Sequence, residues 1–477
     1  MNHNCCVTVP PDSSYKTFGR PLADWQQRLQ AGLTRSVQAS DHTMGHLEET
    51  ILRQTRPLEQ KLLEEATQKK ADQTPPLCPV CGRKLTRRTH DHKRTYQSRF
   101  GPVTIRRTRG WCRRCQAWCF PADHALGLAD TGGDSPGVQE MAALTVSKLP
   151  VEQAAAVIER LTGVKLPRAT LDREARRQGQ RAERLREKLD QEMQTPEGRR
   201  QQVSDLQRQP APQPFTLVLE LDAWNLRERD DWGQTEALRA AGEEPSRWHW
   251  VYGGICFRLA HRAETAGGRP VLLSRGTVMT RGGLDALRTQ LWAEAMRHGL
   301  GEASKVLIVA DGAVWIWNLA TDRFPQALQR LDPWHALEHL WVVAEALYPG
   351  DAAAAKAWFA PLKTKLLAGQ GAVVIDDLEA VLPCLRGAKR KAVQAEAAYL
   401  ETHRERMDYD VAKARGEPSG SGAMESCCRQ YQCRFKRPGQ FWSRPGDEAL
   451  MCLETFWRNG RWHWLFPHAA PSDLCKN

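Results

Sequence analysis

Two short cysteine pairs constrain the fold of this chain more than any other feature. Cys78 and Cys81 lie in CPVCG, and Cys112 and Cys115 lie in CRRC about thirty residues later. A gap of two residues lets both thiolates of a pair reach one metal ion, and tetrahedral zinc takes four such ligands. The pairs therefore predict a structural zinc site, with Cys119 as an alternative fourth ligand and unligated thiols as the contrary interpretation.

The residues between the cysteine pairs favour a β-hairpin. The run QSRFGPVTIRRTRGW has a Gly101-Pro102 turn between β-favouring segments, a pattern that fits a zinc ribbon. Pro75 and Pro76 end a preceding stretch in which leucines recur at helical spacing. We therefore expect a helical leader over residues 1–74 and a zinc ribbon over residues 75–130.

The expected ribbon is strongly basic, and Asp91 is its only acid between the first cysteine and Cys119. Its basic residues, with three aromatic residues interleaved, include Arg83, Lys84, Arg87, Arg88, Lys93, Arg94, Tyr96, Arg99, Phe100, Arg106, Arg107, Arg109 and Trp111. Phosphate tracking with base or sugar contacts needs such a face. We expect Arg106, Arg107 and Arg109 to contact DNA, and a solvated basic surface is the alternative.

Length and charge indicate a multidomain protein that binds polyanions. A chain of 477 residues exceeds the size at which a single hydrophobic core stops growing. Its net charge of +12 favours nucleic acid through counterion release. No apolar run approaches bilayer length, and the N-terminus MNHNCCVTVPPDSSYK does not resemble a secretory signal. We expect a cytoplasmic, nucleoid-associated protein with no membrane partner and with reduced cysteines.

Residues 135–204 have helical spacing and form a candidate DNA-binding module. VEQAAAVIERLTG and KLPRATLDREARRQGQR are joined by a turn over Gly163–Pro167, and Thr170 is a candidate N-cap. Two helices joined in this way can form a helix-turn-helix or an ordinary helical hairpin, and the spacing does not separate the two. Residues 205–214, DLQRQPAPQP, hold three prolines and are typical of an extended linker.

Residues 214–477 form the largest expected domain, which is of mixed α/β type. Four strands are predicted by the β-rich runs FTLVLELDAWNL, RWHWVYGGICFRLA, RPVLLSRGTVMT and KVLIVADGAVWI. A helix is expected from about Gly283 to His298, and FPQALQRLDPWHALEHLWVVAEALY follows with helical spacing. Beyond Gly350 we expect almost only helices.

Two aspartates end buried strands in this domain. Asp222 lies in VLELD and Asp311 lies in VLIVADG, and strand ends are where α/β sheets bind ligands. Two carboxylates there can hold Mg²⁺ while a substrate phosphate completes the coordination. Glu425 in GSGAMES, which opens the basic segment CCRQYQCRFKRPGQFWS, is the candidate third acid. For each aspartate alone, a strand-end cap or a turn is the alternative role.

Other acids compete with this assignment. Glu220 lies on the same strand face one step before the first aspartate, where we expect it to be less exposed. Asp230 and Asp231 are nearby rivals. In DPWH, Asp332 and His335 are candidates to orient substrate or support the site, and helix capping by Asp332 is an equal alternative.

The order of these motifs resembles the ISKra family of insertion-sequence transposases, distant relatives of the Mutator-like group. The resemblance extends from about residue 75 to residue 460 through CPVCG, GPVTIRRTRGWCRRC, the LTG and ATLDR helices, LELDAW, VADGAVWIW, LDPWHALEHLW and GSGAMES with RFKRPGQFWS. The closing pattern, GSGxxES followed by RxKxxGxxWS, is its most specific part.

The resemblance implies a multidomain α/β protein whose RNase H-like catalytic domain carries Asp222, Asp311 and Glu425 as a DDE triad. It also implies a helical insertion at about residues 350–415 and matches DPWH to that group's DxxH element. Enzymes of this kind hold two Mg²⁺ or Mn²⁺ ions on the triad, and they cleave DNA and transfer the cut strand. The implied partners are double-stranded terminal repeats, a double-stranded target site and further copies of the chain.

The basic segment after the third acid is the second candidate DNA contact, through Arg434, Lys436 and Arg437. Two other functions compete with transposition. A transposase-derived DNA-binding protein would have an eroded triad, and the triad is intact here. A sugar hydrolase with paired carboxylates would not need the basic ribbon.

Overall fold

The protein has a mixed α/β fold with several sheets. The computed structural model describes residues 19–129, 131–206, 214–229, 234–242, 248–268 and 270–468. Most of the expected linker, residues 207–213, and the rival acids Asp230 and Asp231 lie outside the described residues. The chain divides into two compact units, residues 1–174 and 175–477. That division falls within a helix, and the expected domain boundaries remain predictions.

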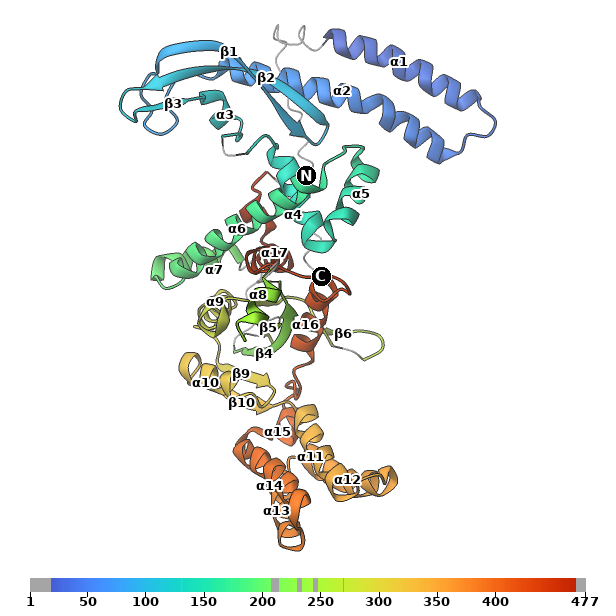
Figure 1. The fold of residues 1–477 in the computed structure, drawn as a ribbon, viewed down its shortest axis with the longest axis vertical. Helices are drawn as coiled ribbons and strands as arrows, with labels where there is room; N and C mark the ends of the chain where they lie inside the picture. The colour runs from blue at the N-terminus through green and yellow to red at the C-terminus, as the bar shows by residue number, and fades with distance from the viewer. Residues whose placement is uncertain are drawn as a thin grey trace, which may run out of the picture. The chain divides into compact units, whose positions relative to one another are not determined.

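The first unit begins with two helices that pack against each other, α1 (Gly19–Gln38) and α2 (Met44–Gln73) (Figure 1). They confirm the helical spacing of the leader. Helix α2 ends at Gln73 because Pro75 and Pro76 follow, and neither proline can donate a backbone hydrogen bond.

A three-stranded antiparallel sheet follows, in the order β1 (Thr86–Ser98), β2 (Gly101–Cys112) and β3 (Ala117–Cys119). The predicted hairpin is confirmed, and Gly101 adopts φ +114°, a backbone conformation that favours glycine. Tyr96, Val103 and Ile105 form its core. The expectation that Tyr96 is interleaved on the basic surface is wrong, because its side chain is buried.

Side chains of α2 satisfy the backbone of β2 at regular intervals. Gln60 donates to the Pro102 carbonyl at 2.6 Å, and the Thr104 amide donates to Glu64 at 3.1 Å. Gln68 accepts from the Arg106 amide at 2.8 Å. Four residues of helix advance about 6 Å and two residues of strand about 6.8 Å, so the two repeats stay in step. The helix thereby covers a strand edge that would otherwise be open to pairing.

Three further helices continue the chain, namely α3 (Pro121–Ala125), α4 (Pro136–Lys148) and α5 (Val151–Thr162). Gly163 ends α5 in the left-handed conformation at φ +68°. Helix α6 (Arg168–Glu192) then crosses into the second unit. The prediction that Thr170 caps this helix is wrong, because the helix begins at Arg168 and the Pro167 carbonyl accepts from the Thr170 amide.

The second unit is built on a five-stranded sheet in the order β10-β9-β4-β5-β8. Its strands are β4 (Thr216–Arg227), β5 (Trp248–Arg258), β8 (Gly276–Thr280), β9 (Lys305–Ala310) and β10 (Leu328–Leu331). Strands β4, β9 and β10 are parallel, whereas β4, β5 and β8 are antiparallel to their neighbours. A separate hairpin is formed by β6 (Arg262–Glu264) and β7 (Pro270–Leu272).

Two sequence expectations about this sheet are wrong. Strand β10 lies in a stretch that was expected to be helical, so the sheet has a fifth strand. Only four residues long, β10 gives too short a run for strand alternation to stand out from helical spacing. The run expected to continue β9 instead starts helix α10 (Val314–Arg323).

Helices cover both faces of the sheet. Leu217, Leu219 and Leu221 of β4 point into the main core with α9 (Gly283–Arg297), α10 and α11 (Pro333–Leu347). On the opposite face, Val218 packs near Ala423 of α16 (Gly422–Phe435). Helix α17 (Arg444–Arg458) packs against β8.

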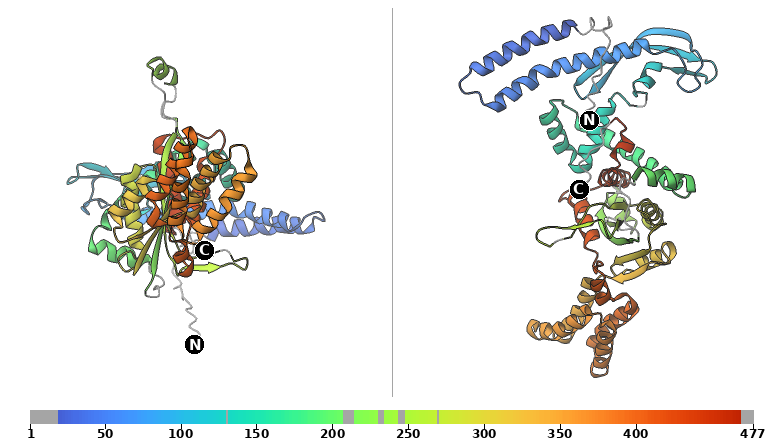
Figure 2. Two further views of the ribbon diagram at one scale, coloured as in Figure 1. Left: turned by 90° about the horizontal axis from the view of Figure 1, so that it is seen from below. Right: turned by 180° about the vertical axis from the view of Figure 1, so that it is seen from behind.

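The region beyond residue 350 is helical, as predicted. Its part before α16 consists of α12 (Ala352–Leu367), α13 (Gly371–Val381), η2 (Leu382–Cys384), α14 (Gly387–Thr402), η3 (Arg404–Arg406) and α15 (Tyr409–Ala414). These helices gather with α11 beyond the β10 edge (Figure 2). The other helices of the unit are α7 (Pro196–Leu206), α8 (Thr235–Ala240) and α18 (Trp462–Leu465). None of the described helices combines the length and apolar character needed to cross a bilayer.

Candidate metal centre and acidic site

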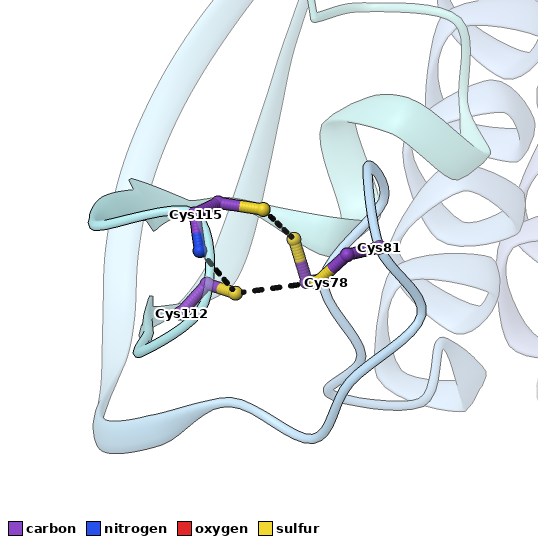
Figure 3. Close-up of side chains that lie close together, drawn as sticks. All are labelled: Cys78, Cys81, Cys112 and Cys115. Carbon is purple, nitrogen blue, oxygen red and sulfur yellow. Dashed lines mark hydrogen bonds between the residues drawn. The ribbon is translucent and has the colours of Figure 1, made fainter.

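The four cysteines of the two pairs converge at one end of the β1–β3 sheet (Figure 3). All four sulfur atoms lie within 4.8 Å of one another. The Cys78 and Cys115 sulfurs are 3.9 Å apart, and those of Cys81 and Cys112 are 3.4 Å apart. Zinc–sulfur bonds of about 2.3 Å in a tetrahedron would separate the sulfurs by about 3.8 Å. The cluster therefore has the donor set and the dimensions to hold a structural zinc ion.

Local backbone geometry prepares one of these thiols for metal. The backbone amides of Cys81 and Val80 both donate to the Cys78 sulfur, and the Cys81 amide has the larger effect. These hydrogen bonds lower the pKa of the Cys78 thiol to about 6. The thiolate is the form that binds zinc. Cys119 packs beside the cluster but is not one of the four converging residues. Burial raises the pKa of Cys119 to about 11, so a neutral thiol is favoured there.

The predicted DNA-contacting arginines of the hairpin differ in exposure. Arg106 is exposed, whereas Arg109 is half-buried with its guanidinium 4.3 Å from the centre of the Trp118 ring. Arg107 is buried, forms an ion pair with Asp123 and lies over an aromatic ring. The expectation of a DNA contact by Arg107 is therefore corrected, because its charge is used inside the module and is not offered to a phosphate.

In the second unit, three neighbouring parallel strands each lead into an aspartate at the same level. Their last mutually paired residues are Leu221 of β4, Ala310 of β9 and Leu331 of β10. The next residues are Asp222, Asp311 and Asp332. Strand β4 does not end there as expected but continues to Arg227, because β5 still pairs with it beyond the end of β9.

Asp222 and Asp311 are partly exposed on this acidic edge. Asp222 accepts from the Ala223 amide at 2.6 Å, and Asp311 accepts from the Ala313 amide at 2.9 Å. Burial raises the pKa of Asp222, and the negative charge of Asp311 raises it further. The Cys428 thiol of α16 opposes this shift by hydrogen bonding to Asp222. The two aspartates are thus close enough to repel each other.

Glu425 lies in the first turn of α16, the helix that packs on β4 and β5. Its side chain is 40% exposed and lies 3.2 Å from Arg429. A glycine permits the close approach of this helix, because a Cβ atom at Gly253 would lie 2.4 Å from the terminal carbon of Met424. The helical spacing of Glu425 and Cys428 puts both on one side of α16, toward the aspartates.

Glu220 anchors the beginning of α16 and is not a rival ligand on the surface. It is 1% exposed, as expected from its place one step earlier in the strand, and it accepts from the Met424 amide at 2.8 Å. Burial raises the pKa of Glu220 to about 8, while hydrogen bonds from the amides of Met424 and Ala423 oppose that shift. This carboxyl thus acts as a cap supplied by a different element from the helix it caps.

Asp332 is the second anchor of α16. It is fully buried and accepts from the Trp334 amide at 2.7 Å, which confirms the helix-capping alternative for this residue. Its other oxygen accepts from both the amide and the hydroxyl of Ser421, each at 2.7 Å. His335 is 37% exposed and lies 3.2 Å from Glu338, and a positive charge on its ring would oppose the rise in the pKa of Asp222.

The helical region contacts the loop that carries Asp311. Tyr399 of α14 lies directly over Gly312, where an added Cβ atom would be 1.8 Å from the Tyr399 hydroxyl. The backbone of Gly312 also hydrogen-bonds to Tyr399 and to His403. His403 packs edge-on against Tyr399, with the ring centres 4.8 Å apart. No sequence pattern predicts this contact, since its partners are about 90 residues apart.

The three candidate ligands are not drawn tightly together. Among the described residues, groups of three or more potential ligands within 4.8 Å are the four cysteines and a set of Cys256, Glu294 and His298. The second set is an ion-pair centre, because Arg461 donates to both oxygens of Glu294. The acidic edge is therefore a more open arrangement of oxygen donors, which suits the ligand chemistry of Mg²⁺.

The buried basic residue of the closing segment has an interior role. Arg434 is 6% exposed, and its guanidinium is 4.9 Å from the centre of the Trp442 ring. Burial lowers the pKa of Arg434 to about 10. Lys436 is exposed and Arg437 is half-buried. The expectation of a DNA contact is thus corrected for Arg434 and stays a prediction for the other two.

Comparison with known proteins does not identify a function for the chain. Neither a protein-family model nor a curated protein matches the chain. The cysteine cluster, the acidic edge and the basic residues described above are therefore the observations that bear on function.

Proposed function

We propose that the protein is a DDE transposase of the ISKra type, which cleaves the ends of its insertion sequence and transfers the cut strand to target DNA. The observation that carries the proposal is the acidic edge itself. Asp222 and Asp311 share one register on adjacent parallel strands, and Glu425 approaches from the helix that covers the same face. Three partly exposed carboxylates that come from separate elements at one sheet edge favour metal binding over a purely structural role.

The strand order supports an RNase H-like domain. Along the chain, the strands of the sheet are β4, β5, β8, β9 and β10, and across the sheet the order is 3-2-1-4-5. The first three strands are antiparallel and the last two run parallel to the first, which agrees with that fold. The helical region between Asp311 and Glu425 corresponds to the insertion that the resemblance implies.

Each residue of the edge has a distinct role in the proposed reaction. Asp222, Asp311 and Glu425 would hold the divalent ions, Mg²⁺ or Mn²⁺, with their carboxylate oxygens. When bound, such ions activate water or a 3′ hydroxyl and stabilise the leaving oxygen at phosphorus. Glu220 and Asp332 position the third ligand by fixing the start of α16. Tyr399 fixes the loop of the second ligand through Gly312.

Most of the proposed DNA-binding parts precede the five-stranded sheet in the chain. A zinc ribbon over β1–β3 would present Arg106 and Arg109 to phosphates, and the helices α5 and α6 form the proposed helix-turn-helix. Lys436 and Arg437 would contact DNA near the acidic edge. The protein would act in the cytoplasm, on the nucleoid. Synapsis of two DNA ends there would require more than one copy of the chain.

The decisive experiment is cleavage of labelled duplex DNA that carries the flanking ends of the element, with Mg²⁺. Asp311→Asn keeps the size of the side chain and removes one ligand charge. We expect cleavage to fall at least about 1000-fold, equivalent to about 4 kcal/mol of transition-state stabilisation. Asp285→Asn is the matched control, because it removes the same charge from a side chain that is 95% exposed on α9.

The outcomes separate the candidate functions. Cutting by the wild type and by Asp285→Asn, but not by Asp311→Asn, would establish the triad aspartate and the enzyme together. Salt-sensitive DNA binding by all three proteins without cutting, under Mg²⁺ and under Mn²⁺, would contradict the proposal and favour a DNA-binding protein derived from a transposase.

A further inference from the structure

A row of aromatic side chains lies on the sheet face opposite the carboxylates. Trp248 and Trp250 at the start of β5 are 59% and 51% exposed. They alternate with His249 and therefore share a face with half-buried Tyr252. Side chains two apart on a strand are separated by about 6.8 Å along it. Two large apolar surfaces are thus held at a regular interval on a rigid element.

The row leads toward the loop of Asp311. Tyr252 packs edge-on against Trp315 of α10, with the ring centres 5.2 Å apart. Trp315 follows Asp311 by four residues, in the first turn of that helix. The far end of the row is formed by the tryptophans, which pair with Asn225 and Arg227 of β4. An extended ligand lying along β5 would therefore run toward the helix that follows Asp311, on the sheet face opposite the carboxylates.

The exposure of the two tryptophans follows from the length of the neighbouring strands. Strand β8 pairs with β5 only as far as Tyr252, and β9 pairs with β4 only as far as Leu221. Beyond those points, among the described strands, the sheet is continued by β4 and β5 alone. The main core, which covers this face elsewhere, includes Tyr252 at its border but neither tryptophan.

Cations lie beside the row and match an anionic ligand. The Arg227 guanidinium is 5.9 Å from the centre of the Trp248 ring and 4.8 Å from that of Phe441. Arg229 lies over the same Phe441 ring at 3.7 Å. Exposed aromatic faces next to arginine are the combination that binds single-stranded nucleic acid, since every base can stack and every linkage carries a negative charge.

We propose that Trp248 and Trp250 form a stacking platform for unpaired bases of single-stranded DNA, with Arg227 neutralising the backbone. The inference deepens the proposed function, on which it rests for the identity of the nucleic acid. Its role is to hold, on the other face of the same sheet, a strand that becomes unpaired during end cleavage. A platform of this kind accepts any base sequence, because stacking does not read base edges.

The test measures binding of a labelled oligothymidine to the full chain by fluorescence anisotropy, without added divalent metal. The Trp248→Ala, Trp250→Ala double variant should bind roughly 25-fold more weakly or worse, since each stacked base contributes roughly a 5- to 150-fold factor. The corresponding Phe variants should bind within a few fold of the wild type, because phenylalanine also stacks. Trp334→Ala is the control, since Trp334 on α11 is 62% exposed and lies outside the row.

The readouts distinguish this inference from the proposed function. Asp311→Asn should bind oligothymidine like the wild type, and all the tryptophan variants should keep their affinity for blunt duplex. Loss of single-strand binding in the Trp248→Ala, Trp250→Ala variant but not in Trp334→Ala supports the platform, even if no DNA is cut. Equal loss in Trp334→Ala, or no loss in either of these variants, overturns the platform. Unchanged DNA binding with an altered oligomeric state would assign the surface to a second copy of the chain instead.

Discussion

The cysteine cluster and the acidic edge are both sets of candidate metal ligands, but the chain assembles them in different ways. The cluster draws its four ligands from two tight turns at the ends of one hairpin, about thirty residues apart. The acidic edge takes its three candidate ligands from two strands and a helix, and the first and last of these ligands are about 200 residues apart. In the first region the metal would hold the fold, whereas in the second the fold holds the ligands.

This difference follows from what surrounds each set. The core beside the cysteines is small, with Leu85 as its main apolar residue. The acidic edge, by contrast, is the rim of a sheet whose core continues through the helices up to Tyr409. Removing a cysteine ligand should therefore unfold the hairpin end in the first unit. Removing one of the acidic residues should leave the second unit folded.

The largest expected effect is that of Cys112→Ser. Loss of one thiolate should reduce bound zinc from about one ion per chain to nearly none, because structural zinc contributes on the order of 10 kcal/mol to small domains. Amide protection should disappear from β1–β3 and persist in the five-stranded sheet, as measured by hydrogen exchange with zinc analysis.

Cys119→Ser is the control for this experiment, since Cys119 lies beside the four converging thiols but is not one of them. It should keep its zinc and its protection. Loss of zinc in the control, or a Cys112→Ser protein with full protection of β1–β3, would contradict the division of roles between the two regions.

A second variant breaks the acidic edge without touching a ligand. Gly312→Ala would bring a methyl group to 1.8 Å from the Tyr399 hydroxyl, so the loop after Asp311 must shift. We expect a loss of about 1–3 kcal/mol in the free energy of unfolding and a fall in DNA cleavage of at least about 10-fold. Urea unfolding and the cleavage assay measure the two effects.

Gly301→Ala is the matched control, because its new Cβ would meet only Met296 at 3.7 Å. Adding Tyr399→Ala to Gly312→Ala should restore part of the lost stability, since the clash partner is removed. If the double variant were no more stable than the single one, the contact between the helical region and the loop would not be the cause.

The two regions differ in how much of each can be predicted from the sequence. The CxxC spacing is a local geometric requirement, so the four converging residues were all predicted. Strand-end aspartates could also be predicted, because buried strands have a strong apolar signature. The interior ion pair of Arg107 could not be predicted, because a basic run on a strand does not reveal which face of the strand contacts Asp123.

The residues that support the acidic edge, Glu220 and Tyr399, could not be predicted from the sequence. Glu220 caps a helix about 200 residues away, and Tyr399 covers a loop about 90 residues away. Such pairings depend on how the strands and helices pack, and a single sequence carries no record of it. Strand β10 was missed because four residues do not establish an alternation.

Taken per pH unit, the smallest expected effect on stability is a pH dependence that originates at Glu220. Burial raises its pKa in the folded protein to about 8, above the usual value near 4.5, with the charges of Asp332 and Glu425 adding to the shift. The folded state therefore binds this proton more tightly than the unfolded state. The corresponding stability is fully present below about pH 4.5 and is lost as the pH rises through 8, with a slope of at most about 1.4 kcal/mol per pH unit.

Glu220→Gln should remove that slope, because the amide has no proton to lose and its oxygen can still accept from the Met424 amide. We expect the difference in unfolding free energy between wild type and variant to change steadily from pH 5 to pH 8, measured by urea unfolding of the full chain. Glu264→Gln, at an exposed site on β6, should leave the wild-type slope unchanged. A parallel pair of curves for wild type and Glu220→Gln would mean that α16 is not anchored by this buried carboxyl. The ligand geometry of the acidic edge would then depend on Asp332 alone.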